Sequence, residues 1–481
     1  MIIFIAKDKF KTENIEYESS PFIFEKLVKK IKIDGYLSVI QPTPEDVRIY
    51  YKIGTVETEE VIKHLISKDN GESFETDPLI YDKNKSYCHN LVVFIDENPR
   101  VAKENKIKAL GGRHGISKIY QQKSGNNPVI DGKKYDKNIC KYFIDKKRWS
   151  PENTIIYSPF EKCDNYANGL HCFTIINNQL KHINNDLPIV SGFHEGRHDG
   201  FYGSVGVKKI KDINESLNNG LSCFDGAQNI VYCPIKNEYI LYARANIMQG
   251  VRSIQFATSK DLVSWSRFEL IKVNNREEYI LNDNYYYCNF FKSGNIFIGI
   301  LPYIRKTKDI NNWTFGGGHH SFYGDGKFLL MTSLDGKNWD IIGKVLNYNY
   351  ETDYIAIGKP VISKDKKKHY FYVNQKGNLN LYSIPKNRLG CIKSKTGVVG
   401  TIILENVKPI SDNVSINCKI ESGGYIKIYD KEFGCDSEVD PIINITGPCD
   451  ELNKVLTGIK SQSSWVIKVF KAKLYSLEGV E

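Results

Sequence analysis

Short runs of apolar residues, separated by polar turns, recur along most of the chain. Tyr, Ile, Val and Phe dominate these runs, and this composition is typical of β-strands rather than helices. One segment, FIFEKLVKKIK at 22–32, has apolar residues at helical spacing, within a leading segment that we place at residues 1–35. The pattern predicts an all-β protein with a single helix near its start.

A turn sequence follows three of these runs: Ser-x-Asp, then an aromatic residue after three or four further positions. The copies lie in SKDNGESF at 67–74, TSKDLVSW at 258–265 and TSLDGKNW at 332–339. In the first, Asp69-Asn70-Gly71 is hairpin chemistry, because Asn and Gly tolerate the positive φ of tight turns. A calcium loop is excluded there, since the twelfth position counted from Asp69 is Ile80 and not glutamate. We expect structural turns in which each aspartate bonds backbone amides.

The same relation of strand to turn appears five times. FTIINNQLKHI from Phe173 is a degenerate copy, and LNLYSIP from Leu379 is a fifth strand in the same relation to its neighbours. Repeats of roughly 40 to 50 residues built from short strands are typical of β-propeller blades. The sequence therefore predicts a five-bladed β-propeller over residues 36–387, with an insertion at about 111–168 in the second blade. Each turn should lie on outer strands, with its aromatic packed between the sheets of its own blade or the next; a β-sandwich with coincidental turns is the alternative.

The pattern of apolar and polar residues changes after PKNRLG at 385–390. The turn sequence disappears and alternating strands follow, such as VSINCKI and GYIKIYD. Such alternation over about 90 residues is typical of a β-sandwich of ordinary domain size. We therefore expect a C-terminal β-sandwich over residues 388–481.

Composition narrows the class of protein further. The chain has 481 residues, which fits two domains, and its net charge of +10 is spread among acidic residues without a nucleic-acid-binding motif. The eleven cysteines are an odd number and contain no Cys-x-x-Cys, which fits reduced, mostly buried thiols. The start, MIIFIAKDKF, has too short an apolar run for a secretory signal, and no run is long enough to cross a membrane. We expect cytoplasmic synthesis, no cofactor or metal, and neither nucleic acid nor membrane as a partner; the oligomeric state is left open.

Three stretches carry a resemblance to a known family: YCHNLVVFIDENP, FDGAQNIVYCPIKNEYILYARAN with GVRSIQFATSKDLVSWS, and MTSLDGKNWD. Together they resemble a bacterial family described as glycosidases, similar to the five-bladed propellers of glycoside hydrolase families 32 and 43. That family's third blade usually reads Phe-Asp-Ser-Gln-Asn, then a strand ending in arginine, then Arg-x-Ile-x-x-Ala-Thr-Ser. The positions that match are Phe224, Asp225, Gln228, Asn229, Arg244, Arg252, Ile254, Ala257, Thr258 and Ser259.

The chain departs from this family at two places. Gly226-Ala227 interrupts the third-blade motif, and YYYCNFFKSGN stands where the fourth blade usually carries Arg-x-Pro-His. The turn sequence also resembles the Asp box of sialidases, which is structural there. The resemblance implies a propeller glycosidase fold and, with the fourth-blade departure, favours glycan binding as much as hydrolysis.

Glycoside hydrolysis needs two carboxyl groups, one to protonate the leaving oxygen and one to attack or to activate water. In a propeller the first residues of the inner strands line a pocket at one mouth, so acids at these positions are the catalytic candidates. Asp225 precedes AQNIVY, Asp283 precedes the YYYCNFF strand, and Glu351 and Asp353 precede YIAIGKP. Each has a structural alternative: Asp225 can cap its own Asp-Gly turn, and Asp283 and Asp353 stand in polar loops.

Polar and planar side chains near the same strand starts are candidates for holding sugar hydroxyls and rings. These candidates are His89, Asn90, Gln228, Asn229, Arg244, Arg252 and Tyr286. Arg244 ends an apolar strand and is either an ion-pair partner of Asp225 or a substrate clamp. For Tyr286, a place in the hydrophobic core is favoured over stacking on a sugar ring, because β-sheet cores contain many aromatic residues. GFHEGRHDGFYGS at 192–204 does not match His-Glu-x-x-His and its glycines argue against a helix, so we expect a loop over the pocket and no metal site.

These features predict a glycoside hydrolase that acts on a glycan through paired carboxylates in the central pocket. The alternative is a non-catalytic glycan-binding or virion or cell-surface structural protein that keeps the propeller without the acids in register. The sugar, the linkage and the stereochemical outcome are left open.

Overall fold

The computed structural model describes residues 2–3, 10–31, 33, 36–53, 61–77, 89–112, 129–130, 133–134, 169–177, 179–184, 189–191, 227–246, 252–266, 269–274, 283–285, 287–305, 325–349, 356–375, 377–405, 407, 413–430, 441–457, 464–478 and 480. Nearly all of them lie in strands and the turns between them, with a short 3-10 helix, η2, at Lys103–Asn105. Within the described part of the chain, no helix is long and apolar enough to span a membrane.

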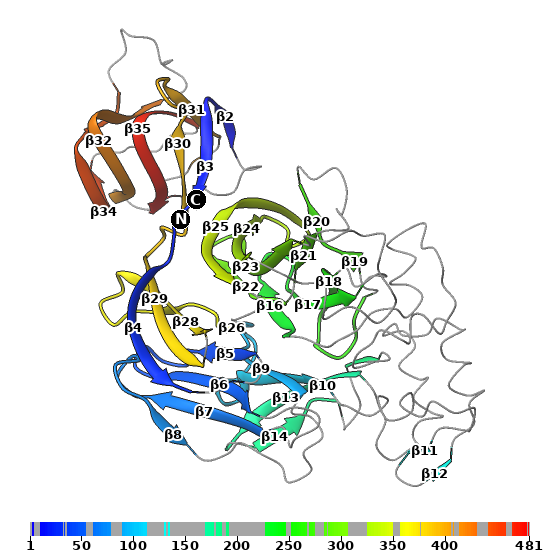
Figure 1. Ribbon diagram of the computed structural model, residues 1–481. Helices are drawn as coiled ribbons and strands as arrows, with labels where there is room; N and C mark the ends of the chain where they lie inside the picture. Colours follow the sequence, from blue (N-terminus) through cyan, green and yellow to red (C-terminus); the bar gives the residue numbers. More distant parts are fainter. Residues whose placement is uncertain are drawn as a thin grey trace.

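Five sheets arranged around an axis form a five-bladed β-propeller (Figure 1). Blade one contains β5 (Leu37–Ile40), β6 (Val47–Ile53), β7 (Val61–Ser67) and β8 (Glu75–Asp77). Blade two contains β9 (His89–Ile95), β10 (Ile107–Gly112), β13 (Gly169–Ile176) and β14 (Gln179–His182), with β15 (Val190–Ser191) beside β13. Blade three contains β16 (Asn229–Cys233), β17 (Glu238–Asn246), β18 (Arg252–Ser259) and β19 (Glu269–Leu270).

Blades four and five follow the same antiparallel plan. Blade four contains β21 (Asp283–Tyr285), β22 (Phe290–Ser293), β23 (Ile296–Arg305), β24 (Asp325–Ser333) and β25 (Asn338–Asn349), with β20 (Lys272–Val273) parallel to β25. Blade five contains β26 (Ala356–Ile357), β27 (Val361–Ile362), β28 (Lys368–Gln375), β29 (Asn378–Pro385) and β4 (Ile23–Lys30). A separate hairpin joins β11 (Val129–Ile130) and β12 (Lys133–Lys134). The expected five-bladed propeller is confirmed.

The expected helix at 22–32 is wrong, because this segment forms the outermost strand of blade five. β4 pairs antiparallel with β29, with Lys30 opposite Asn378 and Ile23 opposite Ser383. Its apolar residues do not form a buried helical stripe: Ile23 is 54% exposed and Phe24 57% exposed. The pairing with a strand about 350 positions away therefore overrides the local periodicity.

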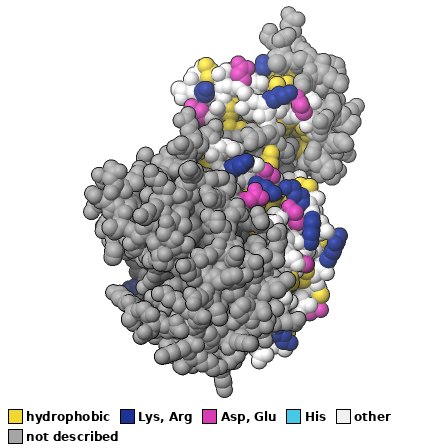
Figure 2. Space-filling view, turned by 90° about the vertical axis from the view of Figure 1, so that its right-hand side faces the viewer, with side chains coloured by type: hydrophobic (Ala, Val, Ile, Leu, Met, Phe, Trp, Pro, Cys, Tyr) yellow, Lys and Arg dark blue, Asp and Glu magenta, His cyan; other side chains and the backbone are white. Residues whose placement is uncertain are grey.

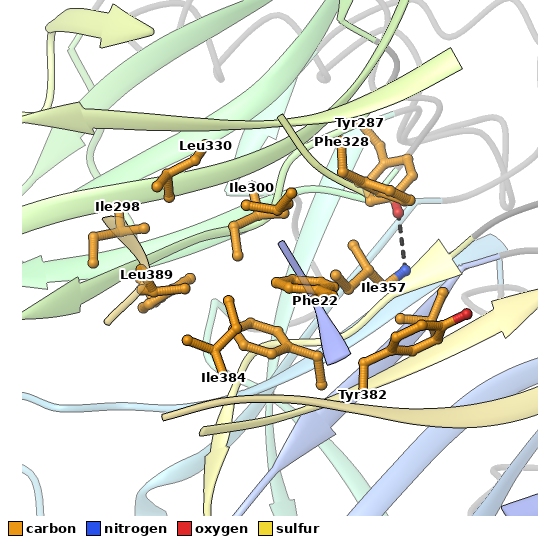
Figure 3. Close-up of a cluster of buried hydrophobic side chains, with 14 of the residues drawn as sticks. Phe22, Tyr287, Ile298, Ile300, Phe328, Leu330, Ile357, Tyr382, Ile384 and Leu389 are labelled. Carbon is orange, nitrogen blue, oxygen red and sulfur yellow. Dashed lines mark hydrogen bonds between the residues drawn. The ribbon is translucent and has the colours of Figure 1, made fainter. Parts of the chain in front are cut away.

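An apolar layer fills the gap between each pair of neighbouring blades. Figure 3 shows the layer between blades four and five, where Ile298, Ile300 and Leu330 meet Phe22 and Ile384. Four further clusters fill the other gaps around the ring. The blades are thus joined mainly by side-chain packing, whereas strands within a blade are joined by backbone ladders.

The repeated turns are structural, as expected. Asp69 lies between β7 and β8 and accepts hydrogen bonds from the Ser67 hydroxyl at 2.6 Å and the Ser73 amide at 3.0 Å. These bonds hold the pKa of the Asp69 carboxyl well below its usual range. Asp261 and Asp335 accept equivalent bonds in the turns after β18 and β24. All three turns lie on the outer strands, away from the axis.

The aromatic residue of each turn packs against the preceding blade, and Trp339 also contacts Phe290 of its own blade at 4.7 Å, whereas none of these contacts is with the next blade. Phe74 contacts Tyr372 of blade five edge-on at 5.6 Å, Trp339 contacts Tyr242 of blade three at 6.0 Å, and Trp265 lies in the layer between blades two and three. Each turn therefore joins two blades as well as two strands.

The C-terminal β-sandwich is one nine-stranded sheet that folds over on itself. Its strands are β30 (Gly390–Ser394), β31 (Gly400–Glu405), β32 (Asn413–Asp430), β33 (Ile443–Thr446), β34 (Cys449–Thr457) and β35 (Ser464–Glu478), together with β1 (Ile2–Ile3), β2 (Lys11–Glu13) and β3 (Ile15–Ser19). Its core contains Trp465, which is fully buried. The two ends of the chain therefore share one sheet (Figure 1).

Arg388 holds the junction between propeller and sandwich. Its side chain is buried and lies 4.6 Å from the ring of Tyr475. The guanidinium donates to Asn417 Oδ1 at 2.6 Å, to the Cys418 carbonyl at 3.1 Å and to the carboxylate of Asp450. A planar, always charged group is suited to this multiple recognition.

Candidate functional site

The inner strands β5, β9, β16, β22 and β26–β27 surround the axis, and their first residues gather at one end, which we call the front mouth. Polar side chains are buried there. Gln228 and Asn229 lie at the start of β16 with 1% and 3% of their surface exposed, and Asn289, just before β22, is 3% exposed. Buried amides are costly unless their hydrogen bonds are made, so their position at one mouth marks a candidate polar site.

Arg244 lies on β17, beside the first residues of β16, and is 2% exposed. Its backbone carbonyl accepts a bond from Gln255 Nε2 at 3.0 Å. Burial raises the pKa of the Cys288 thiol in blade four, and the positive charge of Arg244 opposes this effect, which places the guanidinium near blade four. A guanidinium is planar and always charged, so Arg244 places a buried positive charge near the front mouth.

Asn229 presents a buried acceptor whose hydrogen bond is not made. Its Oδ1 atom has no hydrogen-bond partner in the described structure. Leaving a buried acceptor unsatisfied costs about 1–3 kcal/mol. A donor that enters the front mouth, such as a hydroxyl group, would recover this energy.

Lys359 reaches across the axis from blade five. Its Nζ atom donates to the Ile230 carbonyl at 3.4 Å, and because blades five and three are not neighbours this bond crosses the axis. Burial lowers the pKa of Lys359, while the charge of Glu97 opposes the shift. The adjacent cavity, which Asp96 and Tyr239 also line, has room for about one water molecule.

Several sequence-predicted site residues are placed only by their backbone. His89 and Asn90 begin β9, Arg252 begins β18, and Asp283 begins β21 opposite Arg305. These strand starts are the positions expected for a front-mouth site.

The other candidates, Asp225, Tyr286, Glu351 and Asp353, lie outside the described residues, as does the 192–204 segment. Whether the carboxyl groups meet across the axis thus stays a prediction. The described residues contain no group of three His, Cys, Asp or Glu side chains that could hold a metal ion.

Sequence reasoning missed Tyr287 and Asn289, which bond blade four to blade five near the axis. Both stand in the apolar-aromatic run YYYCNFF, where a tyrosine and an asparagine read as ordinary core and turn residues. An asparagine inside an otherwise apolar inner strand was the available signal.

Charges on the described surface are mixed. On the face shown in Figure 2, Lys and Arg side chains are interspersed with Asp and Glu rather than gathered into one patch. Ion pairs such as Lys368–Glu25 at 2.7 Å and Lys11–Glu405 at 2.8 Å belong to this pattern.

Comparison with known proteins gives likeness of fold alone. No protein-family profile and no curated protein sequence matches the chain. Among solved structures, the α-L-arabinanase of Penicillium chrysogenum complexed with arabinobiose has 11% identity, a TM-score of 0.37, and alignment over 78% of this chain and 98% of its own. A thermostable family-43 glycoside hydrolase has 10% identity, a TM-score of 0.40, and coverage of 76% and 92%. The GH32 β-fructofuranosidase BmSUC1 of Bombyx mori has 11% identity, a TM-score of 0.35, and coverage of 96% and 93%.

Proposed function

We propose that the protein is a glycoside hydrolase whose site is the front mouth of the propeller. The observation that carries this proposal is the unsatisfied Oδ1 atom of buried Asn229, beside the buried guanidinium of Arg244. A sugar presents many hydroxyl groups, each of which both donates and accepts hydrogen bonds. Such a ligand supplies the donor that Asn229 lacks and the acceptors that a guanidinium binds.

The proposed chemistry uses carboxyl groups at three successive strand starts. Asp225 works with Glu351 or Asp353, and Asp283 is the further candidate: one carboxyl protonates the leaving oxygen, and the other attacks the sugar or activates water. A nearby guanidinium favours the ionised form of a carboxyl group. Arg244, on the strand next to the one that follows Asp225, would accordingly assign Asp225 the role of the ionised partner.

The remaining candidates bind substrate in this proposal. His89, Asn90, Gln228, Asn229, Arg244 and Arg252 hold sugar hydroxyls, and Tyr286 lies beside the ring.

A non-catalytic glycan-binding protein is the second candidate, and one feature of the sequence favours it. YYYCNFFKSGN stands where the fourth blade of the resembling family usually carries Arg-x-Pro-His. Loss of these pocket residues favours a mouth that binds sugar hydroxyls, through side chains such as Gln228 and Asn229, without cleaving the glycan.

Screening the purified protein on aryl glycosides and on a glycan array separates these functions. Asp225→Asn is the test variant, since it keeps the size of the side chain and removes the carboxyl group. Asp365→Asn is the matched control: Asp365 lies in an exposed turn at the rear end of blade five, where it accepts a bond from Ser363 at 2.6 Å that an amide oxygen can also accept.

Cleavage that falls at least a hundredfold in Asp225→Asn and persists in Asp365→Asn supports the hydrolase, in keeping with the usual contribution of general acid–base catalysis of about 10²–10⁴-fold. Binding without cleavage by the native protein and both variants supports the binding protein. If the native protein neither binds nor cleaves any glycan, both functions are refuted.

A further inference from the structure

The described inner strand of blade five is held by a short backbone ladder near the front mouth. β26 pairs with β28 through Ala356 opposite Asn374 and Ile357 opposite Val373, and the Gly358 amide donates to the Tyr372 carbonyl at 3.1 Å. The strand resumes as β27 at Val361. Contacts with neighbouring blades add to this short ladder.

Two side chains of blade four supply these contacts. The Ile357 amide donates to Tyr287 Oη at 2.9 Å, and Asn289 Nδ2 donates to the Gly358 carbonyl at 3.2 Å. Tyr287, Asn289 and Ile357 are all at least 97% buried, so these bonds are formed away from water. Figure 3 shows the Tyr287 hydroxyl directed at the Ile357 amide.

Blade one closes the other side of the same segment. A Cβ atom at Gly358 would overlap the side chain of Val39 on β5, so the chain is held between blades four and one at this point. The lack of a side chain at Gly358 permits this approach. Removing a blade-four bond would therefore weaken the hold on a segment that is otherwise kept in place by its short ladder with β28 and by Val39.

We propose that Tyr287 and Asn289 are positioning residues that set where the inner strand of blade five stands at the front mouth. Tyr36, whose ring lies 5.3 Å from that of Tyr287, supports the tyrosine from blade one. The consequence for glycan turnover rests on the proposed function, because Ile357 follows Glu351 and Asp353 in the chain. Displacement of such a segment by about 1 Å can cost roughly a hundredfold in rate.

Tyr287→Phe tests the proposal, since it removes only the hydroxyl group. Tyr372→Phe is the matched control: Tyr372 is fully buried in β28 of blade five, and its Oη atom has no hydrogen-bond partner in the described structure. Hydrogen exchange is measured on the peptide that contains Ile357, and turnover is measured on whichever aryl glycoside the native protein cleaves. If the native protein only binds a glycan, the dissociation constant replaces turnover.

We expect exchange at Ile357 to be about tenfold faster in Tyr287→Phe, as loss of a bond of this kind implies, and unchanged in Tyr372→Phe. The turnover number should fall at least tenfold while KM stays within about twofold, because Glu351 and Asp353, the proposed carboxyl groups, directly precede this segment in the chain. Unchanged exchange would refute the positioning role outright. If exchange is faster in Tyr287→Phe but turnover or glycan affinity stays native, Tyr287 stabilises the segment without positioning the site, and the proposal is refuted.

Failure of the proposed function gives a different result. The native protein would then neither cleave nor bind any glycan, while the exchange measurement would still accept or refute the role of Tyr287.

Discussion

Substituting Gly71 by alanine tests the close packing of one blade's turn against the preceding blade. Gly71 has φ of +86°, and a Cβ atom there would overlap the hydroxyl oxygen of Tyr372 in blade five. The left-handed conformation costs an alanine about 1–2 kcal/mol, and overpacking of a filled interior costs about 1–3 kcal/mol. We therefore expect Gly71→Ala to lower the free energy of unfolding of the propeller by about 2–5 kcal/mol.

Two further variants separate these costs. Gly377 has a similar φ of +69° but open space around a built Cβ atom, so Gly377→Ala should show the conformational cost alone. Tyr372→Phe removes the overlapping oxygen and leaves the ring carbon Cζ 3.4 Å from the Cβ position. In the Tyr372→Phe background, Gly71→Ala should therefore be less destabilising than in the native protein, by the overpacking cost of about 1–3 kcal/mol.

Urea unfolding followed by circular dichroism measures the native protein, the three single variants and the double variant, at constant m-value, through the shift of the midpoint. Equal losses in Gly71→Ala and Gly377→Ala would contradict the close approach of the two blades. A loss in Gly71→Ala that Tyr372→Phe does not reduce would show that the hydroxyl is not the obstacle.

Two other predictions concern a turn and the domain junction. Asp335 accepts amide bonds from Lys337 at 2.7 Å and Asn338 at 2.8 Å, so Asp335→Ala should lower the free energy of unfolding by about 1 kcal/mol at pH 7. Burial acts to raise the pKa of Asp335, but these bonds outweigh it and the pKa is lowered. The contribution of Asp335 to stability is therefore present above about pH 4 and is lost as pH falls through the folded-state pKa. The urea midpoints of the native protein and Asp335→Ala should differ at pH 7 and lie closer together at pH 3, and an equal difference at both pH values would contradict this. Arg388→Met should destabilise the sandwich by about 2–4 kcal/mol, because Asn417 and neighbouring acceptors lose a buried charged donor. Hydrogen exchange in β32 and β35 measures this loss, and a fully native result in Arg388→Lys would contradict the need for the planar group.

The turns could be predicted from sequence because their stabilising bonds are local. In each copy the aspartate accepts hydrogen bonds from groups no more than four residues away, so the residues that stabilise the turn all lie within the motif. The surface on which the aromatic packs is not local. Phe74 meets Tyr372 almost 300 positions further along the chain, and nothing in SKDNGESF encodes that partner.

The same limit explains the error at residues 22–32. Apolar spacing in FIFEKLVKKIK fits a helix if the segment is judged by itself. Blade five, however, has an edge at β29 that the segment can pair with, and strand pairing satisfies its backbone groups there. The distant edge decides the secondary structure.

For the candidate site, sequence reasoning identified polar residues that interrupt an apolar strand start or end. Gln228, Asn229 and Arg244 were found in this way, and the structure buries all three near the front mouth. Tyr287 and Asn289 act across a blade boundary, on the backbone of a segment about 70 residues later. Asn289 is visible in the sequence as a polar residue within an apolar run, but its partner, a distant backbone group, is not.

Closure of the ring links the front mouth to both ends of the chain. β4 completes blade five by pairing with β29, while β1 pairs with β35 and so brings Ile2 opposite Leu477. Pairings at such separations form late, because the entropy of closing a long loop must be overcome before the contacts contribute. Blade five carries β26, the segment that Tyr287 holds from blade four. The front mouth therefore reaches its final geometry only when the ring is closed, and the bonds between blades four and five stabilise the step that completes it.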